Sequence, residues 1–178
     1  MPKSPLLAAL LLVAFASVAS AQQPPTTRIR GTIEAVDGAM LSIKSRDGTD
    51  MKVRTTDNVA VFGVAKTDLS EIKPGSYIGV TAMPEPDGTQ KAIAVHIFPE
   101  NQRGAAEGFR PWDLRANSTM TNATVAETVK GTDGQNITVK YKDGEKKVVV
   151  PPGTPIVTFV AGDKSELKPG AKIIIFGA

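Results

Sequence analysis

The sequence predicts an all-β protein in which two small antiparallel β-barrel units follow one another along the chain. The first observation is a repeated hexapeptide, SEIKPG at Ser70–Gly75 and SELKPG at Ser165–Gly170. The second is a pair of strand-and-turn segments upstream of it, Leu41–Gly48 and Ile137–Gly144, which match in the same order. The third is a series of short segments with alternating apolar side chains between turn residues, which is typical of small barrels or sandwiches. Together they indicate a duplicated unit.

The N-terminal residues have the pattern of a secretory signal peptide. Lys3 gives a positive start, Leu6–Val18 is almost entirely apolar, and residues 19–21 (Ala-Ser-Ala) are small enough for cleavage. The apolar run is shorter than the roughly 20 residues that span a bilayer as a helix. We therefore expect a signal peptide at 1–21, a flexible lead at 22–27, and a periplasmic or secreted protein.

The composition excludes several classes of protein. No residue is cysteine, which excludes disulfides, thiolate nucleophiles and cysteine-ligated metals. The formal net charge of +3 is close to balance and gives no reason to expect a polyanionic partner. The aromatic residues are scattered rather than grouped along a basic groove, so we expect no nucleic-acid partner. No later apolar run is long enough to span a membrane, so we expect no transmembrane segment in the mature chain.

The first predicted unit covers residues 28–98. Its turns are marked by Asp-Gly pairs, and its helical turn by Asp68 followed three residues later by Glu71, which is a capping pattern. Gly75 ends that turn and is expected to take a positive φ. We expect strands around residues 28–35, 41–43, 51–53, 58–62, 77–83 and 91–98.

The second predicted unit covers residues 122–178 and repeats this plan. It has no counterpart of the strand Lys91–Phe98, so we expect its barrel to lack the closing strand and to have an open edge. Open edges are usually blunted, paired or covered. Lys172 could blunt this one, the first unit could cover it, or a second copy of the chain could pair with it to give a dimer.

Residues 99–121 form the predicted connector between the units, and they contain the best candidate binding residues. Trp and Arg are the residue types most enriched in binding hot spots, and the large anchors indicate an ordered segment rather than a flexible linker. The candidates are Phe109, Arg110, Trp112 and Arg115, with His96 close by in sequence. The alternative is structural: Phe109 and Trp112 would fill the seam between the units, while the arginines pair with Glu107 and Asp113.

His96 is the single histidine, and it allows two interpretations. Alternation in its strand predicts that Ile93, Val95 and Ile97 point into the barrel, which puts His96 on the outer face. If the protein holds a metal, His96 and Glu100 are the ligands to expect, although one histidine without cysteines is a weak metal signature. The favoured interpretation is a histidine packed under the connector, with no metal and no cofactor.

The turn and strand motifs resemble those of a broad family of exported bacterial domains of unknown function. The resemblance is carried by Gly31–Gly38 (GTIEAVDG), Leu41–Ile43 and Ile72–Gly75, and it covers Arg28–Phe98 well and Asn122–Phe176 more loosely. It implies that the units are small OB-like β-barrels.

Two further segments, His96–Glu100 and Arg110–Leu114, resemble a narrower set of exported proteins that often carry the label "metal ABC transporter permease". A permease needs several spanning helices, so only an association with metal transport is implied.

The sequence favours a non-enzymatic function. No carboxylate pair is suited to acid–base catalysis, no serine lies in a nucleophile elbow, and no glycine-rich nucleotide motif is present. We expect an exported binding or adaptor protein of the bacterial cell envelope, with a protein partner or small ligand. The alternative is a periplasmic metal-handling protein associated with a metal transport system.

Overall fold

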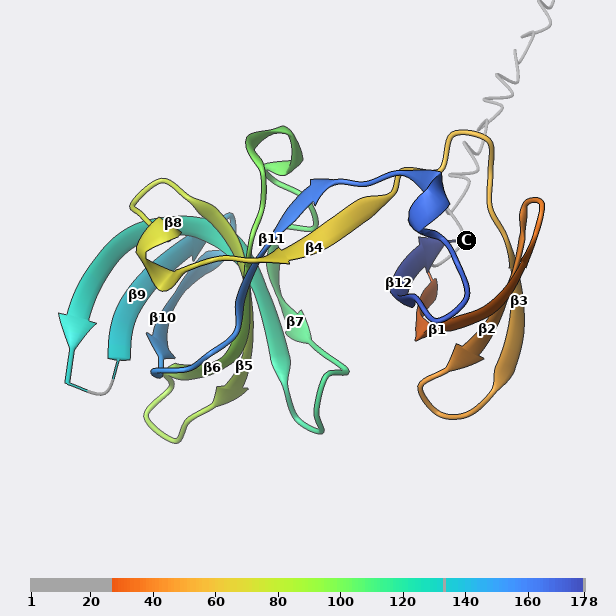
Figure 1. The fold of residues 1–178 in the computed structure, drawn as a ribbon. Helices are drawn as coiled ribbons and strands as arrows, with labels where there is room; N and C mark the ends of the chain where they lie inside the picture. The colour runs from red at the N-terminus through yellow and green to blue at the C-terminus, as the bar shows by residue number, and fades with distance from the viewer. Residues whose placement is uncertain (1–26, 133, 178) are drawn as a thin grey trace, which may run out of the picture.

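The computed structural model describes residues 27–132 and 134–177, which form an all-β fold (Figure 1). The predicted signal peptide and nearly all of the predicted lead lie outside the described residues. No helix in the described part is long and apolar enough to cross a membrane. The strands are β1 (Thr27–Asp37), β2 (Met40–Ser45), β3 (Asp50–Arg54), β4 (Phe62–Lys66), β5 (Tyr77–Pro84), β6 (Gln90–Ile97), β7 (Gly108–Pro111), β8 (Thr119–Gly131), β9 (Gly134–Tyr141), β10 (Gly144–Val150), β11 (Ile156–Ala161) and β12 (Lys172–Gly177). Short 3-10 turns lie at Leu69–Glu71, Glu100–Gln102 and Lys164–Glu166.

Five strands close into a barrel, which we call the barrel lobe. They follow the order β10-β9-β8-β5-β6, and a short parallel pairing of β10 with β6 closes the ring. The side chains of Ile78, Val80 and Val148 lie in its centre and are at most 1% exposed. This lobe holds the larger of the two apolar cores, because side chains enter it from all sides of a closed ring.

The other lobe is a four-stranded antiparallel sheet in the order β12-β1-β2-β3, which we call the sheet lobe. Alternation along β1 and β2 places Ile33, Leu41 and Ile43 on one face, where they are at most 2% exposed. Leu167 and neighbouring side chains of β12 pack against them but stay partly exposed. The core of this lobe is small because only one face of an open sheet is covered.

The lobes do not follow the predicted ranges 28–98 and 122–178, because the two halves of the chain exchange their last strands. β5 pairs with β8 of the second half, and β12 of the second half pairs with β1. The two exchanged strands begin with equivalent hydrogen bonds. Gly75 N donates to Val125 O, and Gly170 N donates to Ile33 O, each at 2.8 Å. Each lobe therefore contains strands of both halves, which corrects the expected succession of two separately paired barrels.

The exchange also moves the open edge. The sequence predicts that the second half is the open one, whereas the barrel around β8, β9 and β10 is closed by β5 and β6 from the first half. The lobe around β1, β2 and β3 receives only β12. The open lobe is thus the one that begins the described chain.

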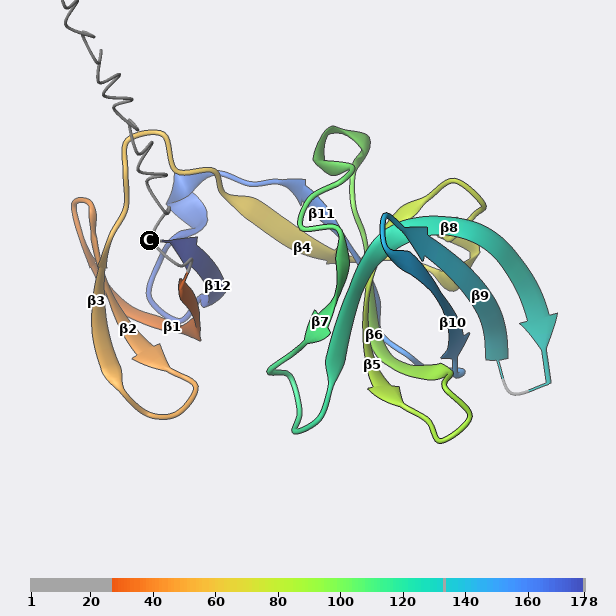
Figure 2. The same ribbon diagram turned by 180° about the vertical axis from the view of Figure 1, so that it is seen from behind.

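β4 and β11 connect the lobes as a two-stranded antiparallel ribbon (Figures 1 and 2). β4 leads from the sheet lobe to the barrel lobe, and β11 leads back. Val64 lies opposite Phe159 at the middle of the ribbon. These two strands are the segments where each half of the chain crosses to the other lobe.

The two KPG turns have the same backbone conformation. Gly75 has φ of 89° and Gly170 has φ of 88°, which confirms the predicted positive φ at Gly75. The preceding 3-10 turns differ in capping: Asp163 and Glu166 form a complete capping box, whereas the side chain of Asp68 makes no capping hydrogen bond. The capping predicted at Asp68 is therefore wrong, and the same motif caps the second turn.

Candidate functional site

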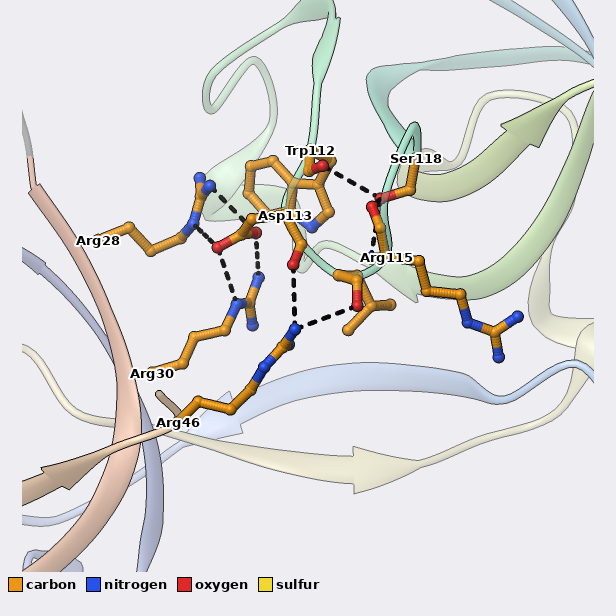
Figure 3. A network of polar contacts seen from close by, with 8 residues as sticks. Arg28, Arg30, Arg46, Trp112, Asp113, Arg115 and Ser118 are labelled. Atoms are coloured by element: carbon orange, nitrogen blue, oxygen red, sulfur yellow. Dashed lines mark hydrogen bonds and ion pairs between the residues drawn. The ribbon is translucent and has the colours of Figure 1, made fainter. Parts of the chain in front are cut away.

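The loop between β7 and β8 reaches from the barrel lobe to the sheet lobe, and Ser118 holds its shape. The Ser118 hydroxyl donates to Arg115 O at 2.7 Å and to Trp112 O at 3.2 Å, and Trp112 N donates to Ser118 O at 2.8 Å. Asn117 takes the left-handed conformation, with φ of 60°, which asparagine tolerates better than most residues. The closed loop presents Trp112 and Asp113 to β1 of the other lobe (Figure 3).

Three arginines of the sheet lobe converge on Asp113 (Figure 3). Arg28 donates through Nε to Oδ2 at 3.1 Å and forms an ion pair with Oδ1 at 3.0 Å. Arg30 donates through Nη2 to Oδ1 at 3.2 Å. Arg46 donates instead to main-chain oxygens, Asp113 O at 3.3 Å and Leu114 O at 3.4 Å. We call these four residues together with Trp112 the arginine cluster.

Trp112 lies against the guanidinium groups of this cluster. The Cζ atom of Arg28 is 3.8 Å from the centroid of the Trp112 ring, and those of Arg110 and Arg30 are 5.5 and 5.6 Å away. Cations at these distances are attracted by the negative face of the indole ring. The ring therefore joins a strand of each lobe, β7 through Arg110 and β1 through Arg28.

The arginine cluster contains more positive than negative charges. Partial burial alone would raise the pKa of Asp113, but the hydrogen bonds and charges of Arg30 and Arg28 hold that pKa below its usual value. Asp113 is ionised at neutral pH as a result. One carboxylate thus faces three guanidinium groups, and the oxygens that accept from Arg46 carry no formal charge.

A cleft of about 310 Å³ lies at this junction of the lobes. It is lined by three arginines, two aspartates and a serine, which gives a small formal excess of positive charge: Arg28, Arg30, Ser45, Arg46, Asp47 and Asp113. The side chain of Asp113 is 46% exposed, whereas those of Arg28 and Arg30 are 26% and 16% exposed. The cleft is small, and it offers an anionic group preorganised guanidinium donors.

The structure separates the predicted connector residues. Phe109 and Trp112 lie three positions apart on and just after β7, so they point to opposite faces of the strand. Phe109 is 40% exposed, and Nζ of Lys146 lies 4.4 Å from its ring centroid. Arg110 donates to Ala106 O at 2.7 Å. The side chain of Arg115 points away from Asp113 (Figure 3).

His96 lies outside the arginine cluster, on the outer face of the barrel. Its ring packs edge-on against Phe98 and Phe159, at centroid distances of 4.7 and 5.4 Å. Burial lowers the pKa of His96 to about 4, and the positive charge of Arg110 adds to this shift. The imidazole is therefore neutral at physiological pH.

The predicted facing of the His96 strand is correct at its end and wrong at its start. Val95 is buried in the barrel core and Ile97 packs against it, but Ala92 rather than Ile93 is buried at the start of the strand. A bulge in the pairing of β5 with β6 between Thr81 and Ala82 shifts the alternation by one residue.

The geometry does not support His96 and Glu100 as a metal site. Both carboxylate oxygens of Glu100 accept hydrogen bonds from Arg103, at 2.6 and 2.7 Å. The described residues hold no group of three or more histidine, cysteine, aspartate or glutamate side chains that could bind a metal ion. The His96 ring packs against the rings of Phe98 and Phe159.

The sequence interpretation missed Arg28, Arg30 and Arg46 as site residues. They lie more than sixty positions from Asp113 in the chain, on β1 and on the turn after β2. One sequence feature points to them. Arg28 and Arg30 share one face of β1, and two like charges on adjacent same-face positions favour a counter-ion between them.

No protein-family model, no curated protein and no solved structure matches this chain.

Proposed function

We propose that this chain is a non-enzymatic binding or adaptor protein of the bacterial cell envelope, and that the arginine cluster binds an anionic group of its ligand. The observation that carries the proposal is the convergence of three arginines from the sheet lobe on Asp113 of the barrel lobe, Arg28 and Arg30 on its carboxylate and Arg46 on its main-chain oxygen. Asp113 then occupies the place of the ligand's carboxylate or phosphate in the free protein.

Three features support this function. Arginine presents planar, paired donors that match carboxylate and phosphate oxygens. The exposed fraction of Asp113 exceeds that of Arg28 and Arg30, so an incoming anion reaches the donors through the open side of the cleft. The cleft also lies where the two lobes meet, and sites between lobes are frequent ligand positions.

We infer further that both lobes derive from one duplicated, OB-like unit. The repeated KPG turns and the matched hydrogen bonds of Gly75 and Gly170 support this origin. The arginine cluster joins the two lobes, so the affinity for a ligand bound there would depend on how the lobes are arranged.

The test uses Trp112, the single tryptophan of the chain, as a fluorescent probe. Citrate, inorganic phosphate and a hexaglutamate peptide are titrated at constant ionic strength. We expect a saturable change in Trp112 emission with at least one of the three, and an affinity at least about tenfold lower in Arg46→Ala, since a charge-assisted hydrogen bond contributes about 1.5–3 kcal/mol.

The matched control is Arg54→Ala, which removes the same charge at the opposite end of the β2–β3 hairpin from Arg46. We expect its affinity to stay within about twofold of the parent's, because long-range charge effects are screened by salt. A non-saturable response to all three anions, or equal losses in the two variants, contradicts the proposed function.

A further inference from the structure

In the described part of the chain, the sheet lobe has no strand at the position that β6 occupies in the barrel lobe. The repeated KPG turns make β12 the counterpart of β5, and the preserved hairpin pairing makes β3 the counterpart of β10. In the barrel lobe β6 pairs with both β5 and β10. Among residues 27–132 and 134–177, no strand pairs with the outer edges of β12 and β3.

Apolar side chains beside this gap are less buried than their counterparts. Ile78 and Val80 of β5 are both 0% exposed, whereas Ile173 and Ile175 at the matching positions of β12 are only partly buried. The difference arises because β6 covers the first pair. Apolar surface that a strand covers in one lobe is open to solvent in the other.

The backbone of β12 also faces the gap with groups that no other described residue pairs. On β5, Ser76 O accepts from Val125 N on the β8 side, and Tyr77 O accepts from Phe98 N on the β6 side, so the direction alternates with each residue. Ala171 O accepts from Ile33 N in the same way as Ser76. The backbone groups directed toward the gap are therefore those of Lys172, Ile174 and Phe176.

The outer face of β12 is apolar as well. Ile174 is 50% exposed and Phe176 is 63% exposed. Within the described residues, β12 is thus an edge strand with isoleucines on its inner face, Ile174 and Phe176 on its outer face, and a row of hydrogen-bonding groups without a strand partner along its edge. Edges of this kind associate with other strands unless they are blocked.

We propose that β12 is a dimerisation edge, and that it pairs antiparallel with β12 of a second copy of this chain about a two-fold axis at Ile174. In this register Ile174 lies opposite Ile174 of the second copy, and Lys172 lies opposite Phe176 of the second copy. All three outward-facing residues of each strand then form hydrogen-bonded pairs. The two sheet lobes join into one continuous sheet.

Self-pairing fits the side chains of β12 on both faces. It sets Ile173 against Ile175 of the second copy on the inner face, and Ile174 against itself on the outer face. The two lysines at position 172 lie at opposite ends of the paired strands, where each faces a phenylalanine ring rather than the other lysine. One strand thus supplies complementary groups for a two-fold contact.

The first test is cysteine crosslinking, for which the chain is suited because it contains no cysteine. Residues in a hydrogen-bonded antiparallel pair have Cα atoms about 5.5 Å apart, within the range of a disulfide. We expect Ile174→Cys to give a covalent dimer on mild oxidation, at least about tenfold faster than Phe176→Cys, which faces Lys172 of the second copy. Val129→Cys is the control, since Val129 is also 50% exposed but lies on the barrel lobe.

The second test is sedimentation velocity over a concentration series. We expect the parent chain to dimerise and Ile174→Lys to weaken the dimer at least tenfold, because it sets two lysines opposite each other at the two-fold axis. Val129→Lys is the charge-matched control and should dimerise like the parent, and circular dichroism verifies that both variants fold. A parent chain that stays monomeric at every concentration, including one that binds a foreign peptide strand at β12, overturns the proposal. So does a dimer that persists in Ile174→Lys.

Discussion

The barrel lobe and the sheet lobe are built from equivalent strands, yet only the first is closed. β5 and β12 follow identical KPG turns and pair with β8 and β1 through equivalent hydrogen bonds. The barrel lobe has one additional strand, β6, and with it Ile78 and Val80 are fully buried. The sheet lobe leaves the matching residues partly exposed. A single strand therefore accounts for the difference between a complete and an incomplete core.

Closure of the barrel by β6 requires a residue without a side chain at position 79 of β5. A Cβ atom at Gly79 would overlap Nε2 of His96 and would lie 2.8 Å from Oδ1 of Asn122. The ring of His96, which belongs to the closing strand, lies in the space that this glycine leaves free. The counterpart of Gly79 on β12 is Ile174, where no histidine has to be accommodated. The residue at this position thus reflects whether the neighbouring strand is present.

The largest expected effect distinguishes the two cores directly. Ile78→Ala should lower the free energy of unfolding by about 3–4 kcal/mol, because it leaves a cavity in a closed core. Ile173→Ala at the matching position should cost about 1–2 kcal/mol, because its side chain is already partly exposed to water. Urea unfolding followed by circular dichroism and by Trp112 fluorescence measures both. The experiment is done at high dilution so that copies of the chain are separated, and equal costs would contradict the difference between the lobes.

A pH effect of somewhat smaller size is expected from the barrel lobe alone. Burial holds the pKa of His96 at about 4 in the folded protein, against an ordinary value of 6.5. Between these two pH values the unfolded chain binds a proton that the folded chain does not. The stabilisation is therefore complete above pH 6.5 and is lost as the pH falls toward 4, by on the order of 2–3 kcal/mol.

Urea unfolding at several pH values between 4 and 7 measures this loss. His96→Gln is the matched variant, since it keeps a neutral polar side chain and removes the titration. Protonation of carboxylates contributes equally to both proteins and cancels in their difference. Parallel stability profiles for the parent and the variant would show that His96 is not the source.

The repeat, the turns and the strand character follow from the sequence, but the exchange of strands does not. Repeated KPG turns and alternating strands are local features, and local features decide which segments form strands. The choice of pairing partner is not a local feature. The turns before β5 and β12 each donate to a main-chain oxygen, Val125 O or Ile33 O, and these two acceptors are equivalent. Two pairings of nearly equal local energy cannot be separated by local patterns. The exchanged pairing is instead tied to the paths of β4 and β11, which carry each half of the chain to the other lobe.

The candidate site shows the same limit. Trp112 stands out in the sequence as a large anchor in a linker, whereas Asp113 is predicted only as a partner of the connector arginines. Their partners Arg28, Arg30 and Arg46 come from the other lobe, so they become neighbours only through the arrangement of the lobes. Phe109 does not fit the structural alternative in which it fills the seam together with Trp112. Strand geometry at β7 turns the two side chains to opposite faces, and Phe109 is 40% exposed.

The smallest expected effect concerns the two KPG turns, which should behave alike although their lobes differ. Gly75 and Gly170 have nearly equal positive φ values, and a Cβ atom added at either position meets no atom within 4 Å. Alanine at either site is therefore penalised by backbone conformation alone, and we expect each substitution to cost about 1 kcal/mol. Urea unfolding of the two variants checks this, with Gly48→Ala as a reference for a hairpin glycine that also has positive φ and open space. If Gly75→Ala costs more than Gly170→Ala by over about 1 kcal/mol, a turn contributes to the difference between the lobes. Equal costs would show that the two turns are energetically equivalent. The difference between the closed and the open lobe would then come from β6 alone.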